Sequence, residues 1–186
     1  MRRIEALRVL AEHTADVPLV VTCAATSREL AAVADRPNHL YLLDSMGLAG
    51  SVATGVALGL PGTRVVAVEG DGSLFMNPNV LPTGGFLRPA NLAMVLLDNG
   101  VYGSTGNLPT YAAQVDLGAL AEASGWSVRR AATPAELGLE LARMLTTDGP
   151  AFLHARIEPG NAADVPKLLE DPVILGRRFH DWLASQ

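Results

Sequence analysis

Short apolar runs alternate with segments of helical periodicity along almost the whole chain of 186 residues. Six of these runs have strand length and are apolar on both faces, as in the strands of a buried parallel sheet. They are residues 17–22, 39–43, 64–68, 91–97, 127–130 and 151–157. Right-handed crossovers through the intervening helices would join such strands. We therefore expect an α/β fold: a single three-layer domain with a six-stranded, mainly parallel sheet and helices on both faces.

Size and composition fit one such domain and argue against several functional classes. Apolar residues make up 49% of the chain and aromatic residues only 5%, so the core must consist mainly of Ala, Val and Leu. The formal charge is −5, and the basic residues are scattered, which argues against binding to nucleic acid or to an anionic membrane. The longest wholly apolar run, 92–97, is far shorter than the roughly 20 residues that span a bilayer. We expect a soluble, cytoplasmic protein.

Two segments rich in Gly and Pro, 99–114 and 158–172, are expected to be long loops. Loops at the carboxyl ends of parallel strands are where α/β proteins bind ligands, so we place the site at the first. The second is expected to be a connector that leads to a terminal helix over 173–183. Residues 47–60 have a helical pattern but many small residues, for which tight packing and ligand contact are equally good explanations.

The strongest local signal is Gly70-Asp71-Gly72-Ser73, directly after one predicted strand, followed by Asp98-Asn99-Gly100 at the end of the next. Asp71 and Asn99 would then meet at one edge of the sheet. Mg²⁺ prefers oxygen ligands and shares them with phosphates, so these two side chains and a main-chain carbonyl, that of Val101, suit it. The glycines and a helix beginning near Ser73 suit a diphosphate. Each motif alone is more typical of a tight turn, but together they favour a metal-diphosphate site.

At these motifs the chain resembles the diphosphate-binding domain of thiamine diphosphate enzymes, and within them the sulfopyruvate and phosphonopyruvate decarboxylases. The similar stretches are 28–30, 44–49, 70–77, 91–107 and 158–166, which together span nearly the whole chain. The resemblance implies that residues 1–186 form one thiamine diphosphate-binding domain, with 158–186 as its C-terminal connector and helix. Its cofactors would be thiamine diphosphate and Mg²⁺.

The resemblance also implies which residues form the site. The metal ligands would be Asp71, Asn99 and Val101, and Met46 would be the apolar wedge beneath the rings of the cofactor. The cofactor-binding residues would be Asp44, Ser45, Met46, Gly47, Gly70, Asp71, Gly72, Ser73, Asn99, Val101, Tyr102 and Gly103. Without the resemblance, Met46 would be interpreted as an ordinary core residue. Candidates for the substrate side are Ser104, Thr105 and Asn107.

Enzymes of this family activate the cofactor with a glutamate from a separate pyrimidine-binding domain. This chain has length for only one such domain, and Glu29 and Glu69 do not lie in the matching context. The resemblance therefore implies a separate α subunit that carries the pyrimidine-binding domain, with the cofactor at the subunit interface. The implied function is the β-type subunit of a heteromeric decarboxylase that acts on a small acidic 2-oxo acid. A carboligase or lyase subunit and a non-catalytic cofactor-binding scaffold stay open as alternatives.

Some features depart from the family or contribute little. No Lys or Arg occurs between Pro89 and Val128, so a sulfonate or phosphonate would need cations of the partner or main-chain N–H groups near 103–106. Leu108 replaces a glutamine of the family, and Pro78 and Pro82 are expected to interrupt the helix after Ser73. The only cysteine, Cys23, is expected to be a buried structural thiol. The histidines show no metal-ligand spacing, and among them we single out His39, which precedes the strand leading to Met46.

Overall fold

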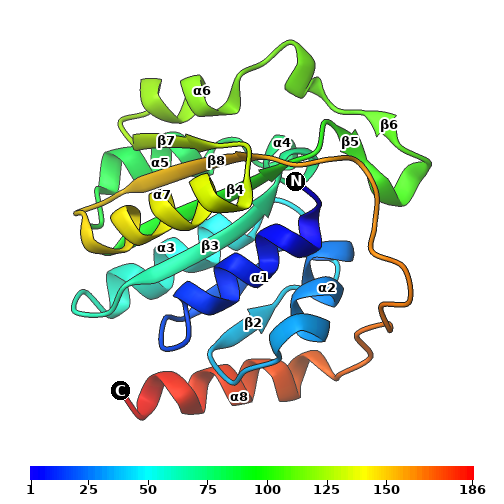
Figure 1. The fold of residues 1–186 in the computed structure, drawn as a ribbon. Coiled ribbons are helices and arrows are strands. Elements are labelled where there is room, and N and C mark those ends of the chain that lie inside the picture. The colour runs from blue at the N-terminus through cyan, green and yellow to red at the C-terminus, as the bar shows by residue number, and fades with distance from the viewer.

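The computed structural model describes residues 1–186 as one α/β domain around a six-stranded sheet (Figure 1). The strand order is β2-β1-β3-β4-β8-β7, and every neighbouring pair is parallel. The strands are β1 (Leu19–Val21), β2 (His39–Tyr41), β3 (Val65–Gly70), β4 (Leu92–Asp98), β7 (Ser127–Ala131) and β8 (Ala151–Arg156). Each of the six predicted runs overlaps one of these strands, and β3, β4 and β7 extend one or two residues beyond the predicted ends. The predicted fold class is confirmed.

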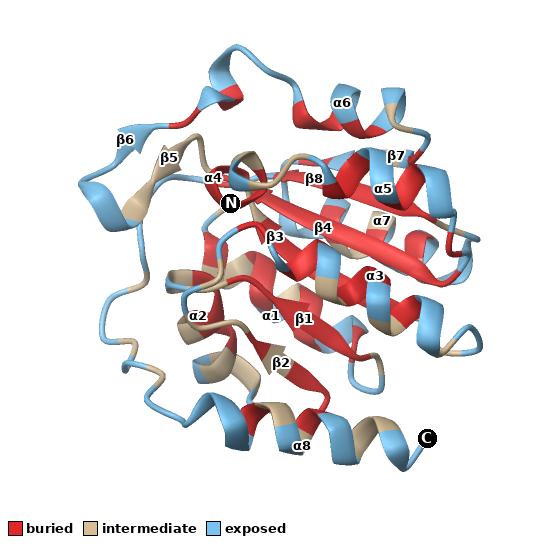
Figure 2. Ribbon diagram, turned by 180° about the vertical axis from the view of Figure 1, so that it is seen from behind, coloured by how far each residue is buried: buried red, intermediate tan, exposed pale blue.

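Helices cover both faces of the sheet, and each face has its own hydrophobic cluster. The helices α1 (Arg3–His13), α2 (Ala25–Ala34) and α7 (Pro134–Thr146) pack on one face. The other face carries α3 (Ala49–Gly59), α4 (Asp71–Met76), α5 (Val80–Leu87) and α6 (Leu117–Ala123). Successive residues of β3 alternate between the two clusters, since Val66 belongs to the first and Ala67 to the second. A central strand is therefore buried on both faces and mainly apolar, and Figure 2 shows this burial for β3 and β4.

The terminal helix α8 (Pro172–Ala184) covers the edge strand β2. It contributes Leu175 to one hydrophobic cluster and Phe179 to the other, so it closes the core at this edge and blocks further strand pairing. Asp171 caps the helix, because its carboxylate accepts a hydrogen bond of 2.7 Å from the main-chain N–H of Val173. Residues 157–171 before it form the connector, which contains no helix or strand and runs along the outside of the domain (Figure 1).

The break after α4 follows from proline chemistry. The helix begins at Asp71 rather than near Ser73 and ends at Met76, and Pro78 lies in the gap before α5. Proline lacks the N–H that would continue the helix. Pro82 is the third residue of α5 and does not interrupt it, since the first turn of a helix has no use for that N–H. Of the two expected interruptions, only the one at Pro78 occurs.

The segment 99–114 is more regular than the loop expected from the sequence. It forms the two-stranded antiparallel pair β5 (Val101–Tyr102) and β6 (Leu108–Pro109), with the 3-10 turns η1 (Gly103–Thr105) and η2 (Tyr111–Ala113). Gly106 and Asn107 turn the chain with φ of 78° and 61°, a region in which Gly and Asn are the favoured residues. The hairpin projects from the sheet edge at which β4 ends (Figure 2).

Tight packing explains one of the glycines in α3. A Cβ on Gly50 would lie 2.5 Å from Cε of Met94 and 2.8 Å from Val80, so the helix approaches the sheet closely there. Gly55 and Gly59 face open space. No helix of the chain is both long enough and apolar enough to span a membrane.

Candidate functional site

A cavity lies at the sheet edge where β1, β3 and β4 end. The chain leaves β1 toward β2 and leaves β3 toward β4, so the order of strands reverses between β1 and β3. Parallel sheets bind ligands outside such a point, because the loops that follow the two strands diverge there. The lining residues are Arg3, Thr22, Cys23, Ala24, Ala25, Thr26, Arg28, Met46, Gly70, Asp71, Gly72, Ser73, Leu97, Asn99, Val101, Tyr102, Gly103, Ser104 and Asn161.

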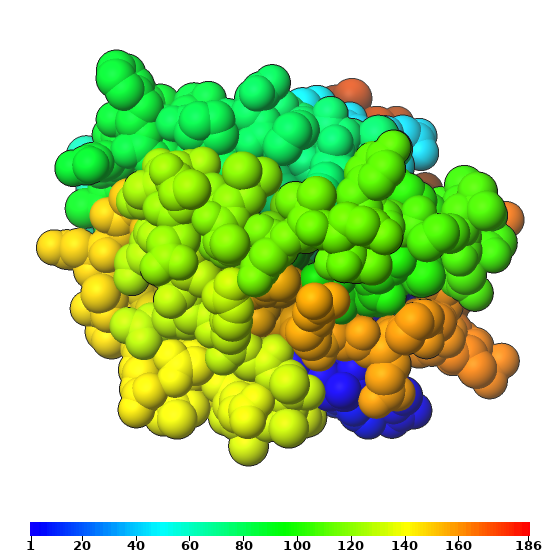
Figure 3. Space-filling model, turned by 90° about the horizontal axis from the view of Figure 1, so that it is seen from above, coloured from blue at the N-terminus to red at the C-terminus, as the bar shows by residue number.

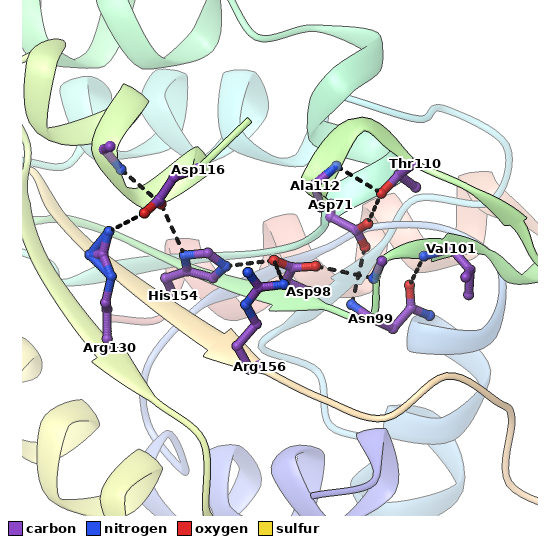
Figure 4. A network of polar contacts seen from close by, with 12 residues as sticks. Asp71, Asp98, Asn99, Val101, Thr110, Ala112, Asp116, Arg130, His154 and Arg156 are labelled. Carbon is purple, nitrogen blue, oxygen red and sulfur yellow. Dashed lines mark hydrogen bonds and ion pairs between the residues drawn. The ribbon is translucent and has the colours of Figure 1, made fainter. Parts of the chain in front are cut away.

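Asp71 and Asn99 lie together at the ends of neighbouring strands. Asn99 donates its main-chain N–H to Oδ1 of Asp71 at 3.3 Å, and its own side-chain oxygen accepts from the N–H of Val101 at 3.0 Å. The hydroxyl of Thr110 donates to Oδ2 of Asp71 at 2.6 Å (Figure 4). Thr110 is buried and comes from the far side of the hairpin, so it ties the hairpin to the carboxylate. No sequence pattern indicates this contact, because it joins residues 39 positions apart.

The electrostatics of Asp71 suit a bound cation. Burial raises the pKa of its carboxyl above the ordinary value, the hydrogen bond from Thr110 opposes this, and the negative charge of Asp98 adds to it. A divalent cation beside Asp71 would favour its ionised form and so offset the effects of burial and of the Asp98 charge. The structure contains no cluster of three or more His, Cys, Asp or Glu side chains suited to a metal. A cation here would rest on one carboxylate and neutral oxygens, which suits Mg²⁺ shared with a phosphate ligand.

The turn that carries Asn99 is held from behind by the buried Asp98 and two side chains of β8. Nε2 of His154 lies 2.7 Å from Oδ2 of Asp98, and Nη1 of Arg156 lies 3.1 Å from the same oxygen. The other oxygen of Asp98 accepts the main-chain N–H of Gly100 at 3.1 Å. Figure 4 shows this row of side chains running from Asp116 past His154 to the turn. His154 therefore has a structural role at this turn.

Ser73 anchors the loop that carries Met46. Its hydroxyl lies 2.7 Å from the hydroxyl of Thr22 after β1, and it accepts the N–H of Gly47 at 2.8 Å. Below it, the fully buried Glu69 accepts the N–H of Ala49 at 3.0 Å, and burial raises the pKa of this carboxyl. Met46 itself is 37% exposed and lines the cavity, which excludes the interpretation as a core residue.

Comparisons with known proteins show the family of the chain. A family model described as "Thiamine pyrophosphate enzyme, C-terminal TPP binding domain" matches residues 22–155. The sulfopyruvate decarboxylase subunit beta of Methanothermobacter thermautotrophicus is 42% identical over 179 residues, which cover 96% of this chain and 94% of the relative. The phosphonopyruvate decarboxylase of Streptomyces viridochromogenes is 41% identical over 185 residues, which cover 98% of this chain and 46% of the relative.

The chain belongs to the thiamine pyrophosphate enzyme family. Solved structures agree on the fold. The benzoylformate decarboxylase from Polynucleobacter necessarius superposes with a TM-score of 0.76 at 22% identity, over 87% of this chain and 34% of that chain. The family predicted from the sequence is therefore confirmed, and so is the prediction that the chain is part of an enzyme of this class.

Most of the site residues predicted from the family resemblance lie around the one cavity. Those that line it are Met46, Gly70, Asp71, Gly72, Ser73, Asn99, Val101, Tyr102, Gly103 and Ser104. Those that do not are Asp44, Ser45, Gly47, Thr105 and Asn107, although Gly47 bonds directly to Ser73. Gly72 has a packing role as well, since a Cβ there would lie 2.5 Å from the ring of Tyr102.

Several lining residues were not predicted. Residues 22–26 follow β1, and the rule that ligands bind at carboxyl ends of strands would have found them. Cys23 belongs to this group. It is half-buried rather than fully buried, contrary to the expectation, and burial raises the pKa of its thiol above the ordinary value. Arg3 and Asn161 come from opposite ends of the chain, and no local pattern indicates them.

The structure changes two expectations from the sequence: basic residues of the chain line the cavity, and His39 lies away from it. Arg3 and Arg28 both line the cavity, so the chain itself places basic residues beside it, which the segment between Pro89 and Val128 does not. His39, singled out earlier, lies away from the cavity on β2. It is buried, with Nδ1 3.1 Å from the hydroxyl of Tyr41, and burial lowers its pKa to about 4. Its role is in packing.

Proposed function

We propose that the chain is the β-type subunit of a heteromeric thiamine diphosphate-dependent 2-oxo acid decarboxylase. It binds the Mg²⁺-diphosphate end of the cofactor and completes the active site with an α subunit that carries a pyrimidine-binding domain. The observation that carries the proposal is the contact between Asp71 and Asn99 at neighbouring strand ends beside the cavity. The names of the relatives, which are decarboxylases, support the reaction.

The residues around the cavity fit the cofactor. The side chains of Asp71 and Asn99 and the carbonyl of Val101 would hold Mg²⁺, and the backbone from Gly70 to Ser73, with Tyr102 and Gly103, would border the diphosphate. A Cβ on Gly70 would meet nothing closer than 4.0 Å, so the space beside it is free. Met46 would support the rings. When bound, thiamine diphosphate supplies the electron sink that lets a 2-oxo acid lose CO₂.

The two buried glutamates near the cavity support the need for a partner. Glu29 is paired with Arg3 at 3.0 Å, and Glu69 is fully buried beneath α3, where it accepts main-chain N–H groups. Neither is free to contact the rings of a cofactor. The proposal therefore assigns the activating glutamate to the α subunit. A match to only 46% of the phosphonopyruvate decarboxylase length is consistent with a second half supplied by another chain.

The test is CO₂ release from sulfopyruvate, phosphonopyruvate and pyruvate by the chain alone and with the α subunit. We expect activity only in the complex, and its loss in Asp71→Asn, while Asp16→Asn, which alters an exposed aspartate away from the cavity, stays active. Full activity of the chain alone would contradict the divided site. Condensation products with an added aldehyde would indicate a carboligase. If Asp71→Ala lost the cofactor and the complex kept its activity, the chain would be a scaffold.

A further inference from the structure

Arg28 is the one arginine at the cavity without a partner in the protein. Its Nε is buried and makes no hydrogen bond. Apart from the exposed Arg8, every other arginine of the chain donates a hydrogen bond or forms an ion pair. Burying a guanidinium donor without an acceptor is costly, so an acceptor supplied by a bound ligand would offset that cost.

The other cation of the cavity is already neutralised. Nη1 of Arg3 lies 3.0 Å from Oε1 of Glu29 and 3.0 Å from Oδ1 of Asn161, so its charge is matched by a buried carboxylate. Glu29 does not line the cavity, whereas Arg28 does. The positive charge that the cavity presents to a ligand is therefore that of Arg28. This supplies the cation that the segment between Pro89 and Val128 lacks.

The backbone that carries Arg28 is fixed on both sides. Its N–H donates to the carbonyl of Ala24 at 3.2 Å within the first turn of α2, and the next residue, Glu29, is held by Arg3. Glu29 also accepts the N–H of Ala162 at 3.0 Å, which attaches the connector to this turn. Figure 3 shows the N-terminal residues in blue beside the orange connector, and Glu158 donates its N–H to the carbonyl of Met1. The site for Arg28 is thus set before a ligand binds.

We propose that Arg28 binds the second acidic group of the substrate, a sulfonate or phosphonate, and so determines the preference for an acidic 2-oxo acid. The inference rests on the proposed function and names the substrate class of that site. A planar guanidinium matches the oxygens of such groups with two parallel hydrogen bonds. The competing anion is the cofactor diphosphate. Asp71 and Asn99 follow β3 and β4, whereas Arg28 follows β1 on the other side of β3. The diphosphate would therefore be bound by the Mg²⁺ at Asp71 and Asn99, which leaves Arg28 for the substrate.

The experiment uses the complex with the α subunit and the variants Arg28→Gln and Arg28→Lys, with Arg8→Gln as the matched control. We expect kcat/KM for sulfopyruvate to fall roughly 100-fold in Arg28→Gln, as when one partner of a buried charge pair is removed. The value for pyruvate, which lacks the second acidic group, should change by less than about threefold, as should the affinity for thiamine diphosphate. Arg28→Lys should recover part of the loss, and Arg8→Gln should behave like the wild type.

Direct binding makes the test independent of turnover. Calorimetry with 3-sulfopropanoate, a substrate-like acid without the 2-oxo group, should show binding to the wild type and at least about 30-fold weaker binding to Arg28→Gln. If the variant loses thiamine diphosphate affinity and all substrates fall equally, Arg28 belongs to the diphosphate and the proposal is wrong. Unchanged sulfopyruvate kinetics would also refute it. If the wild-type complex decarboxylates none of the acids, the proposed function fails, and calorimetry alone then decides the role of Arg28.

Discussion

Replacing Gly72 with alanine separates two possible reasons for a glycine in the Gly70-Asp71-Gly72 motif. The sequence suggests that this glycine lets the backbone approach a diphosphate. In the structure, the position of an added Cβ lies 2.5 Å from Cε1 and 2.6 Å from Cδ1 of Tyr102, and 3.3 Å from Cγ2 of Thr110. Contacts this short force the aromatic ring to move, and overpacking of this kind costs about 1–3 kcal/mol of folding free energy. Gly72→Ala should therefore destabilise the chain without any cofactor present.

A double-mutant cycle identifies the cause. Urea unfolding of the isolated chain is measured for Gly72→Ala, Tyr102→Ala and the double variant, each without cofactor. If the clash with the ring is responsible, alanine at position 72 should cost about 1–3 kcal/mol beside Tyr102 and less than about 0.5 kcal/mol once the ring is removed. An equal cost in both backgrounds would refute the packing explanation. A loss of diphosphate affinity with unchanged stability would instead favour the sequence-based explanation.

Three further predictions concern the surroundings of the site. Thr110→Val removes the donor to Asp71 at constant shape and should weaken Mg²⁺-dependent binding of thiamine diphosphate by about 10-fold or more in a titration, whereas Thr110→Ser should not. Ala24 has a φ of 64° and a ψ of −130°, so Ala24→Gly should raise the unfolding free energy in urea by about 1 kcal/mol or more. The pKa of His39, about 4 in the fold and 6.5 ordinarily, means that the unfolded chain takes up its proton first. The free energy of unfolding that the neutral, buried His39 contributes is therefore fully present above about pH 6.5, and up to about 3 kcal/mol of it is lost as the pH falls toward 4. His39→Gln should make the free energy of unfolding less dependent on pH between these values.

The sequence was sufficient for the sheet because its strands are buried on both faces. A strand such as β4 contributes alternate side chains to two hydrophobic clusters. An unbroken apolar run in the sequence therefore indicates a strand that is buried on both faces. The same logic located Asp71 and Asn99, since the carboxyl ends of adjacent parallel strands meet at one edge. The helix break at Pro78 could also be predicted, because proline lacks the N–H that continues a helix. Pro82 does not break α5, because it lies in the first turn, and the sequence does not show where that helix begins.

The parts of the site that were missed depend on contacts distant in sequence. Thr110 reaches Asp71 only because residues 99–114 fold back as a hairpin, with the N–H of Thr110 donating to the carbonyl of Gly100. Arg3 and Asn161 are 158 positions apart, yet they share a hydrogen bond at the cavity. No periodicity or spacing encodes such a pair. Arg28 was visible as part of a family-like stretch, but only the structure shows that its guanidinium is unpaired.

Three segments at the cavity are each held by polar anchors. His154 and Arg156 hold the turn before Asn99, and Glu69 holds the start of α3 after the Met46 loop. The ion pair between Arg3 and Glu29 holds the first turn of α2. Polar groups oriented in advance bind and stabilise charge without the cost of reorganisation. If the chain is the proposed β-type subunit, the charged end of its ligand site is set in advance, and the partner subunit would add chemistry at the other end without reshaping this one.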